Sequence, residues 1–432
     1  MMNLTHEEQE ILLGRKVEDL LTDEDRRSFT GTVCLITGAG GTVGGELARQ
    51  IAACAPRRLV LLDNSEYALF RIEQSIRESH PDVALEPALC DITRSSSVQR
   101  IMRRFAPDIV FHAAAYKHVT MAERDICATA RVNVLGTSVV LAATRQVGAR
   151  FVCISTDKAA APHSVMGATK RLAEMVTLDT DDDLMRPIVV RFGNVLASSG
   201  SFVELMRERI RDGKPLLVTD PDATRFFMTV SEAASLVMKA TALSRGGETF
   251  WLDMGPQVRI GDLADRLLEA ATRRGLPPVP IEVVGLRPGE KMVEQLAAQG
   301  IGLERTPHAR VFVAHQALAR TTMSGTWIGA LRRAISRDDA YGVMTTLTVV
   351  VRDFVPSEHA WMIAKDARIQ SVNTAKSVRA ARTTVRRAPR VAAGAPARIH
   401  QGVFGASTTP RPATAMAAAA ILPMRPRTAH AR

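Results

Sequence analysis

Residues 33–51 read VCLITGAGGTVGGELARQI: an apolar run of strand type, a glycine-rich turn and the start of a helical pattern. Its glycines include a G-x-x-G-x-x-G series. A dinucleotide needs such a turn, with one glycine for the tight bend, one to admit the pyrophosphate and one for close helix–strand packing. The helix N-terminus then offers free N–H groups and a positive dipole to the phosphates. We therefore expect the cofactor to contact Gly38, Gly41, Thr42, Val43 and Gly44.

An acidic residue ends the next apolar run. The segment RLVLLD, residues 58–63, places Asp63 19 positions after Gly44. A carboxylate there can accept both ribose hydroxyls of NAD and repel the extra phosphate of NADP. A glycine turn alone is weak evidence, since a plain tight turn looks the same. The flanking strand and acid strengthen it, and because no arginine directly follows Asp63, the sequence favours NAD.

Composition limits the class of protein. The chain has 432 residues, 46% hydrophobic and 4% aromatic, enough for one large or two modest domains. No apolar run approaches the ~18 residues needed to span a bilayer, and the N-terminus lacks a signal-peptide core. The five cysteines have no metal-ligand spacing and suit reduced core positions. We expect a cytoplasmic protein with no membrane segment and no metal.

The net charge of +11 is unevenly distributed. Residues 364–432 hold 13 Lys or Arg and one acid, which leaves about −1 for the first 363 residues. The basic excess therefore belongs to the C-terminal part, and we expect no nucleic-acid surface on the folded part. The composition of residues 364–432, without an apolar period, indicates disorder.

Strand and helix patterns alternate from residue 33 onward, which predicts right-handed βαβ units and an α/β fold with a doubly wound parallel sheet. We expect a helical lead-in (1–30), an NAD-binding domain (31–192), a smaller α+β substrate lobe with closing helices (193–363, with an interleaved boundary) and the basic tail (364–432). The predicted strands are 33–37, 58–63, 83–89, 109–113, 151–155 and 187–192, and the predicted helices between them are 44–54, 66–78, 95–105, 122–147 and 165–179.

Polar residues follow several of these strands. Asp91 and Ile92 are placed to meet the adenine ring, and simple capping of the strand end is an equal alternative. In FHAAAYKHV, residues 111–119, small residues such as Ala113 let the backbone approach the nicotinamide ribose. Lys117 and His118 would project into the crevice, although they could also be surface groups. Asn133 lies inside a predicted helix and favours a structural role.

The fifth strand ends in Thr156, Asp157 and Lys158, and Lys170 lies on the following helix. Because strand ends of this fold face the cofactor, these residues are placed for acid–base work. A solvated salt bridge between Asp157 and Lys158 is the alternative.

Many ordered blocks together resemble the extended short-chain dehydrogenase/reductases, and within them the nucleotide-sugar 4,6-dehydratases of polysaccharide biosynthesis. The resemblance covers about residues 11–360, and the basic tail has no counterpart in it. Longer members carry a membrane-spanning region and a further domain, so the chain resembles their soluble catalytic part. The blocks are TGAGGTVGGEL, LLDNSEYALFRIE, FHAAAYKHV, NVLGT, STDKA, SVMGATKRLAE, RFGNVLASSGS, TRFFMT and RPGEK.

The resemblance implies a reaction and roles for the strand-end residues. Bound NAD takes hydride from carbon 4 of a UDP-sugar, such as UDP-N-acetylglucosamine, and returns it to carbon 6. Lys158 would remove the carbon-5 proton and Asp157 would protonate the leaving carbon-6 hydroxyl. Met166 stands where the superfamily has a tyrosine base, so Thr156, Lys158 or a water held by Lys170 are the candidates for deprotonating the carbon-4 hydroxyl.

Further residues would bind the substrate. The resemblance implies that Asn194 holds the nucleotide diphosphate and that Lys117 and His118 also contact the substrate. It further implies that Arg225 and Arg287 contact the diphosphate or uridine, and a guanidinium suits this role because it binds phosphate bidentately. Glu290 and Lys291 fit loop structure. A homo-oligomer is also implied.

Two other functions remain open. A carbon-4 epimerase of the same fold needs no acid at carbon 6. A non-catalytic dinucleotide-binding or nucleic-acid-associated protein would use the basic tail and show salt-sensitive binding.

Overall fold

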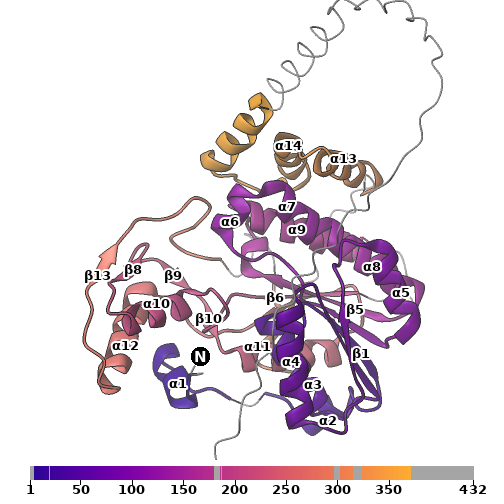
Figure 1. Cartoon of the computed structure of the whole chain (residues 1–432), viewed down its shortest axis with the longest axis horizontal. Helices are drawn as coiled ribbons and strands as arrows, with labels where there is room; N and C mark the ends of the chain where they lie inside the picture. Colours follow the sequence, from indigo (N-terminus) through magenta and orange to yellow (C-terminus); the bar gives the residue numbers. More distant parts are fainter. Residues whose placement is uncertain are drawn as a thin grey trace, which may run out of the picture. The chain divides into compact units, whose positions relative to one another are not determined.

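A sheet of nine strands in the order β14-β15-β11-β6-β5-β4-β1-β2-β3 forms the centre of the structure (Figure 1). The structure, a computed structural model, describes residues 4–18, 20–179, 185, 187–295, 302–314 and 324–370. Strand order reverses between β1 and β4, and all pairings from β3 to β11 are parallel. This confirms the predicted α/β doubly wound fold. The first six strands are β1 (Val33–Thr37), β2 (Arg58–Asp63), β3 (Leu85–Leu89), β4 (Ile109–His112), β5 (Arg150–Thr156) and β6 (Ile188–Phe192).

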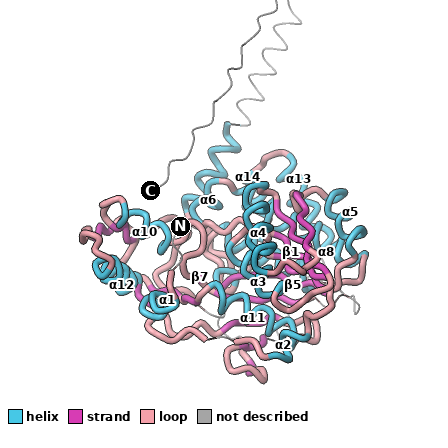
Figure 2. Tube along the Cα trace, turned by 60° about the horizontal axis from the view of Figure 1, so that its bottom comes forward, coloured by secondary structure: helices cyan, strands magenta, loops and turns pink. Residues whose placement is uncertain are grey.

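Helices cover both faces of this sheet (Figure 2). The strands are almost wholly apolar because both of their faces are buried. Cys34 and Ile36 pack in one core cluster, whereas Leu35 packs in another on the opposite face. The first cluster includes α3 (Thr42–Ala52), α4 (Glu66–Ser79) and α11 (Val230–Leu243), and the second includes α5 (Ser95–Phe105) and α8 (Thr137–Gln146).

The helix predicted over 122–147 is interrupted, which corrects the sequence-based expectation. It consists of α6 (Val119–Arg124), α7 (Ile126–Ala130), a π-helical turn (Arg131–Gly136) and α8. In the π-turn, the Asn133 amide bonds both backbone groups of Tyr116 and the hydroxyl of Thr169. These hydrogen bonds join the π-turn to the loop after β4 and to Thr169, which supports the structural role expected for Asn133.

One helical stretch in the described part, Ile126–Gln146, is long and apolar enough to cross a membrane by length and composition, and 61% of its most apolar window is buried within the fold. Such burial is typical of a core helix.

The lobe predicted to bind the substrate is built mainly from residues after β6. It contains three two-stranded sheets and packs around its own apolar cluster, which also takes in α1 (His6–Leu13). Its chain also returns to the main sheet as β11 (Thr249–Leu252), β14 (Glu304–Arg305) and β15 (Val311–Ala314). The lobe elements are β7 (Asn194–Val195), α10 (Phe202–Arg211), β8 (Leu216–Val218), β9 (Thr224–Arg225), β10 (Phe227–Met228), β12 (Val258–Arg259), α12 (Ile260–Arg273) and β13 (Ile281–Val283).

The closing helices α13 (Ser324–Ser336) and α14 (Ala340–Val350) pack against α7 and α9 (Val165–Leu178). A further helix covers residues 358–370, so helical structure extends past residue 364, where the basic tail was expected to begin. The rest of that tail lies outside the described residues. In the lead-in, α2 (Asp23–Arg27) follows α1.

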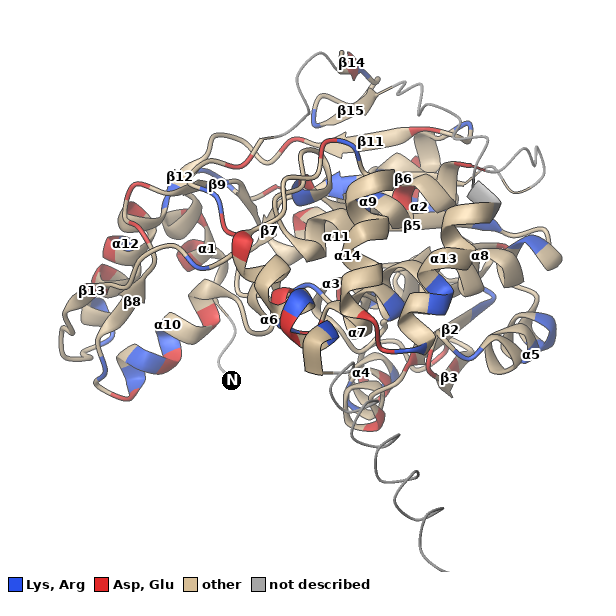
Figure 3. Ribbon diagram, turned by 90° about the horizontal axis from the view of Figure 1, so that it is seen from above, with Lys and Arg blue, Asp and Glu red and all other residues tan. Residues whose placement is uncertain are grey.

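Acidic and basic residues lie close together on the described elements, as on α10 in Figure 3. That helix carries Glu204 and Glu208 among Arg207, Arg209 and Arg211. The interspersed signs agree with the near-neutral charge of the first 363 residues.

Candidate active site

The candidate residues that follow β1, β2, β4 and β5 lie at the carboxyl edge of the sheet because these strands are parallel. Ligands of open α/β sheets bind at this edge, beside the point where strand order reverses. Here that point lies between β1 and β4.

The glycine turn after β1 leaves no room for side chains at Gly38, Gly40 and Gly44. A Cβ on Gly40 would lie 2.5 Å from the Cβ of Ala68. Gly38 has φ +67°, and a Cβ on it would lie 2.7 Å from the backbone nitrogen of Ala114. A Cβ on Gly44 would lie 2.1 Å from the carbonyl oxygen of Gly38. Gly41 caps α3 without a side-chain hydrogen bond, so the first turn of the helix presents its N–H groups to a ligand.

Asp63 ties this turn to the end of β2. Its Oδ2 accepts the Gly40 N–H at 2.9 Å and its Oδ1 accepts the Ser65 N–H at 2.9 Å. The carboxylate is therefore fixed at the end of β2, and its contact with a ribose stays a prediction. Each oxygen keeps a lone pair for a hydroxyl.

The neighbouring candidates have structural contacts of their own. Thr42 accepts the Ser199 N–H at 3.0 Å, which joins the start of α3 to the lobe, and Val43 packs against the main core. Asp91 caps the strand-end turn through the Thr93 N–H and hydroxyl. Ile92 is buried close to Gly136. An adenine contact for Asp91 and Ile92 stays a prediction.

After β4 the chain passes close to the glycine turn. Ala113 donates its N–H to Thr37, and a Cβ on Gly38 would lie 3.0 Å from the Ala113 carbonyl carbon. Lys117 and His118 are exposed. Although both side chains reach solvent, the protein atoms around them reduce their solvation and so lower the pKa of both groups, and the Lys117 charge lowers that of His118 further.

At the end of β5 an acid, an amine and an amide are hydrogen-bonded together. Lys158 Nζ donates to Asp157 Oδ1 and to Asn194 Oδ1, both at 3.0 Å. Thr156 Oγ1 donates to Asp157 Oδ1 at 2.8 Å. Asp157 is 1% exposed, so a solvated surface salt bridge does not describe this pair.

Charges around Lys158 favour its ammonium form. Burial alone would lower the pKa of Lys158, but the Asp157 and Glu294 carboxylates outweigh burial and raise it.

Lys170 and Met166 lie one turn apart on α9. Lys170 is buried, and its Nζ donates to the Ile154 carbonyl of β5 at 2.6 Å. Met166 is also buried, in the cluster of the closing helices. The roles of Lys170 in catalysis and cofactor binding stay predictions.

The two predicted substrate arginines differ in their surroundings. Arg225 is buried, and its guanidinium donates to the carbonyls of Thr224, Lys291 and Met292. It therefore fastens the RPGEK loop to β9. Arg287 lies in that loop and is exposed. Contacts of either arginine with a nucleotide stay predictions.

Sequence reasoning missed two charged residues beside Lys158. The charges of Lys291 and Glu294 both act on the Asp157–Lys158 region. Lys291, assigned to loop structure, donates to the Ala161 carbonyl. The RPGEK block, residues 287–291, was the sequence signal that could have identified them, because Lys291 ends it and Glu294 closely follows it.

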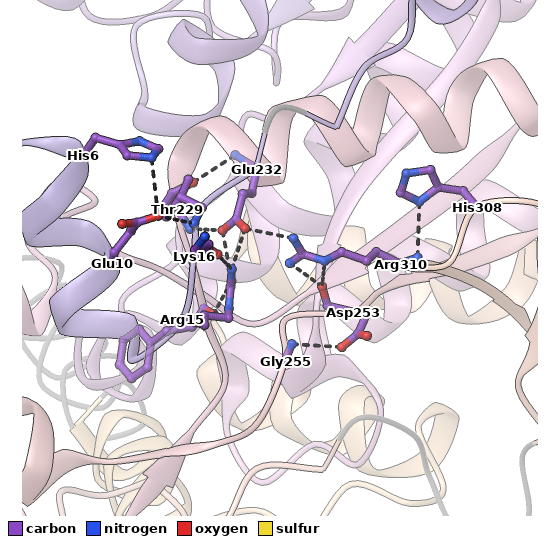
Figure 4. A network of polar contacts seen from close by, with 12 residues as sticks. His6, Glu10, Arg15, Lys16, Thr229, Glu232, Asp253, Gly255, His308 and Arg310 are labelled. Carbon is purple, nitrogen blue, oxygen red and sulfur yellow. Dashed lines mark hydrogen bonds and ion pairs between the residues drawn. The ribbon is translucent and has the colours of Figure 1, made fainter.

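Two polar networks hold the elements under the site. Glu174 of α9 accepts hydrogen bonds from Ser155 and Arg191, each at 2.6 Å. In the second network Glu232 binds Arg15 of the lead-in at 2.6 Å and Arg310 at 2.9 Å (Figure 4). Arg310 also donates to the Asp253 carbonyl.

This fold and strand-end site define a Rossmann-type member of the extended short-chain dehydrogenase/reductases. A family profile described as "Polysaccharide biosynthesis protein" matches residues 34–316. The chain belongs to this polysaccharide biosynthesis family. It is 41% identical over 298 residues to the capsular polysaccharide biosynthesis protein CapD of Staphylococcus aureus, covering 68% of this chain and 50% of CapD. The chain thus spans about half the length of that relative.

Two further similarities bear on the site. A UDP-glucose 4-epimerase of Rickettsia canadensis is 32% identical over 281 residues, which are 62% of this chain and 79% of the epimerase. The X-ray structure of Pen from Bacillus thuringiensis superposes with a TM-score of 0.61 at 30% identity, covering 66% of this chain and 89% of Pen.

Proposed function

We propose that the chain is an NAD-dependent nucleotide-sugar 4,6-dehydratase, acting on UDP-N-acetylglucosamine for polysaccharide synthesis. The hydrogen-bonded Asp157–Lys158 pair at the end of β5 carries this proposal. Elimination of water from carbons 5 and 6 needs a base and an acid side by side.

NAD suits the residues around the glycine turn. Gly38 and Gly44 exclude side chains, Gly41 leaves the start of α3 open, and Asp63 stands at the end of β2. Bound NAD would supply reversible storage of the hydride from carbon 4.

The resting pair is one proton transfer away from its active form. Moving a proton over the 3.0 Å from Lys158 Nζ to Asp157 Oδ1 turns the ammonium and carboxylate into an amine and a carboxylic acid. The amine can then remove the carbon-5 proton, and the acid can protonate the carbon-6 hydroxyl as it leaves. Thr156, whose hydroxyl donates to the same Asp157 oxygen, would take the carbon-4 hydroxyl proton while releasing its own proton to a solvent water.

A direct test incubates the purified protein with NAD and UDP-N-acetylglucosamine in deuterated water and records product mass and cofactor state. Loss of one water, deuterium at carbon 5 and no net NAD consumption are expected. Asp157→Asn and Lys158→Ala should each remove dehydration. An intact substrate mass in the wild-type reaction would contradict the proposal.

A carbon-4 epimerase is the second candidate, supported by the similarity to the Rickettsia UDP-glucose 4-epimerase. It predicts an unchanged mass, inversion at carbon 4 and full activity in Asp157→Asn. A non-catalytic or nucleic-acid-associated role predicts no sugar turnover and salt-sensitive nucleic-acid binding. Homo-oligomer formation and a cytoplasmic location stay predictions.

A further inference from the structure

A second buried carboxylate lies beside the proposed acid–base pair. Glu294 is 5% exposed, and its Oε2 has no hydrogen-bond partner among the described residues. Asp157 Oδ2 is also buried without a hydrogen-bond partner among the described residues. A buried carboxylate oxygen without a partner is costly unless a nearby positive charge compensates for it.

The backbone around Glu294 is firmly held. Its carbonyl accepts a hydrogen bond from Gln257 Nε2 at 2.6 Å. One residue earlier, Val293 forms a β-bridge with Thr224. Arg225 donates to the carbonyls of residues 291 and 292. Three residues before Glu294, Lys291 Nζ donates to the carbonyl of Ala161, which closely follows Lys158, so this segment lies against the end of β5.

We propose that Glu294 is a positioning residue of the active site, whose buried carboxylate shares with Asp157 the positive charge of Lys158. The assignment of Lys158 as the base rests on the proposed function. The effect of the Glu294 carboxylate on the protonation of Lys158 does not depend on that function. Lys158 is also faced by Asn194 from β7, by the Arg225 cation from β9 and by Lys291 from the loop. Asp157 and Glu294 together favour the protonated form of this amine. Glu294 thereby sets how readily Lys158 gives up its proton.

The test is competitive acetylation of the full-length, NAD-supplemented protein with trace acetic anhydride between pH 7 and 11. Only neutral amines react, and peptide mass spectrometry gives the labelling of Lys158 relative to Lys214, whose side chain is 60% exposed. Glu294→Gln should raise this ratio at pH 8 on the order of 3- to 10-fold, because it removes one nearby negative charge. Glu294→Asp should restore the low ratio. Glu282→Gln, which removes an exposed carboxylate from β13, should leave it unchanged.

An unchanged ratio in folded Glu294→Gln would overturn the proposal. If that variant does not fold, the wild-type curve decides: Lys158 must acquire label at higher pH than Lys214, and labelling at equal or lower pH overturns it. Labelling needs no turnover. If UDP-N-acetylglucosamine is not dehydrated but the labelling follows expectation, the proposed function fails while the assignment of Glu294 stands.

Discussion

Replacing Gly38 by alanine should damage both the fold and NAD binding, and Gly31 provides a matched control. Both glycines have left-handed backbones, with φ +67° and +69°. A Cβ on Gly31 would meet nothing within 4 Å, whereas a Cβ on Gly38 would lie 2.7 and 2.8 Å from the nitrogen and Cα of Ala114. The two substitutions therefore share the backbone cost and differ in the clash.

The expected magnitudes follow from these two contributions. An alanine in the left-handed region costs about 1–2 kcal/mol, which is the whole effect expected for Gly31→Ala. Forcing a methyl group against backbone adds about 1–3 kcal/mol, so Gly38→Ala should lose about 2–5 kcal/mol of unfolding free energy. The clash also displaces the 113–114 segment, which lies along the proposed cofactor path, so the affinity for NAD should fall at least about tenfold.

Urea denaturation would give the unfolding free energies, and calorimetric titration with NAD would give the affinities. Equal destabilisation of the two variants, with equal NAD affinity, would refute the steric explanation. If Gly38→Ala is more destabilised than Gly31→Ala but binds NAD with unchanged affinity, the placement of the cofactor at this turn would be refuted.

Two further perturbations test the supporting networks. Burial opposes ionisation of Glu232, but Arg15 and Arg310 lower its pKa from 4.5 to about 2, so its contribution is complete above pH 4.5 and lost as pH falls towards 2. Glu232→Gln should lower the melting temperature at pH 7, which corresponds to a loss of about 2–3 kcal/mol in stability. The difference in melting temperature between wild type and variant should decrease below pH 4.5. A difference that does not change with pH would contradict this explanation. Glu123 accepts the Val165 N–H at 2.7 Å and the Ser357 hydroxyl. Glu123→Ala should therefore cost about 2–3 kcal/mol in urea denaturation. The Ser357 hydroxyl also accepts the Ala360 N–H at the start of the helix 358–370, so adding Ser357→Ala should cost about 1 kcal/mol more, with a total below the sum of the two single losses. Additive losses would show that the two side chains act independently.

Local patterns in the sequence predicted most of the main sheet. Strands 33–37 and 58–63 and the helix 95–105 have the predicted bounds. Each is decided by its own apolar run and flanking turn residues, so no knowledge of distant contacts is required. The glycine turn was predictable only in part for the same reason. The contact that excludes a side chain from Gly44 lies within the turn itself, whereas Gly38 meets the backbone of Ala113 and Ala114 after β4.

Contacts between distant segments were not predictable in this way. Asn194 was assigned to the diphosphate, yet its amide oxygen also accepts a hydrogen bond from Lys158. Arg225 engages the backbone of residues 291 and 292. These partners are 36 and 66–67 positions apart in the chain. Only the return of the lobe to the sheet edge brings them together, and single-sequence patterns do not encode that return.

The proposed acid–base pair follows the end of β5, and polar contacts hold this strand end in place. Ser155, just before Thr156, donates to Glu174, which binds Arg191, and the Arg191 guanidinium lies 4.6 Å from the centre of the Trp251 ring. Arg191 holds the pKa of Glu174 below its ordinary value against the opposing effect of burial. A buried ion pair gains little stability over apolar residues of the same volume. Unlike apolar contacts, its directional hydrogen bonds join β5, β6 and α9 in one orientation, so the direction in which Asp157 and Lys158 leave the strand is set before any ligand binds.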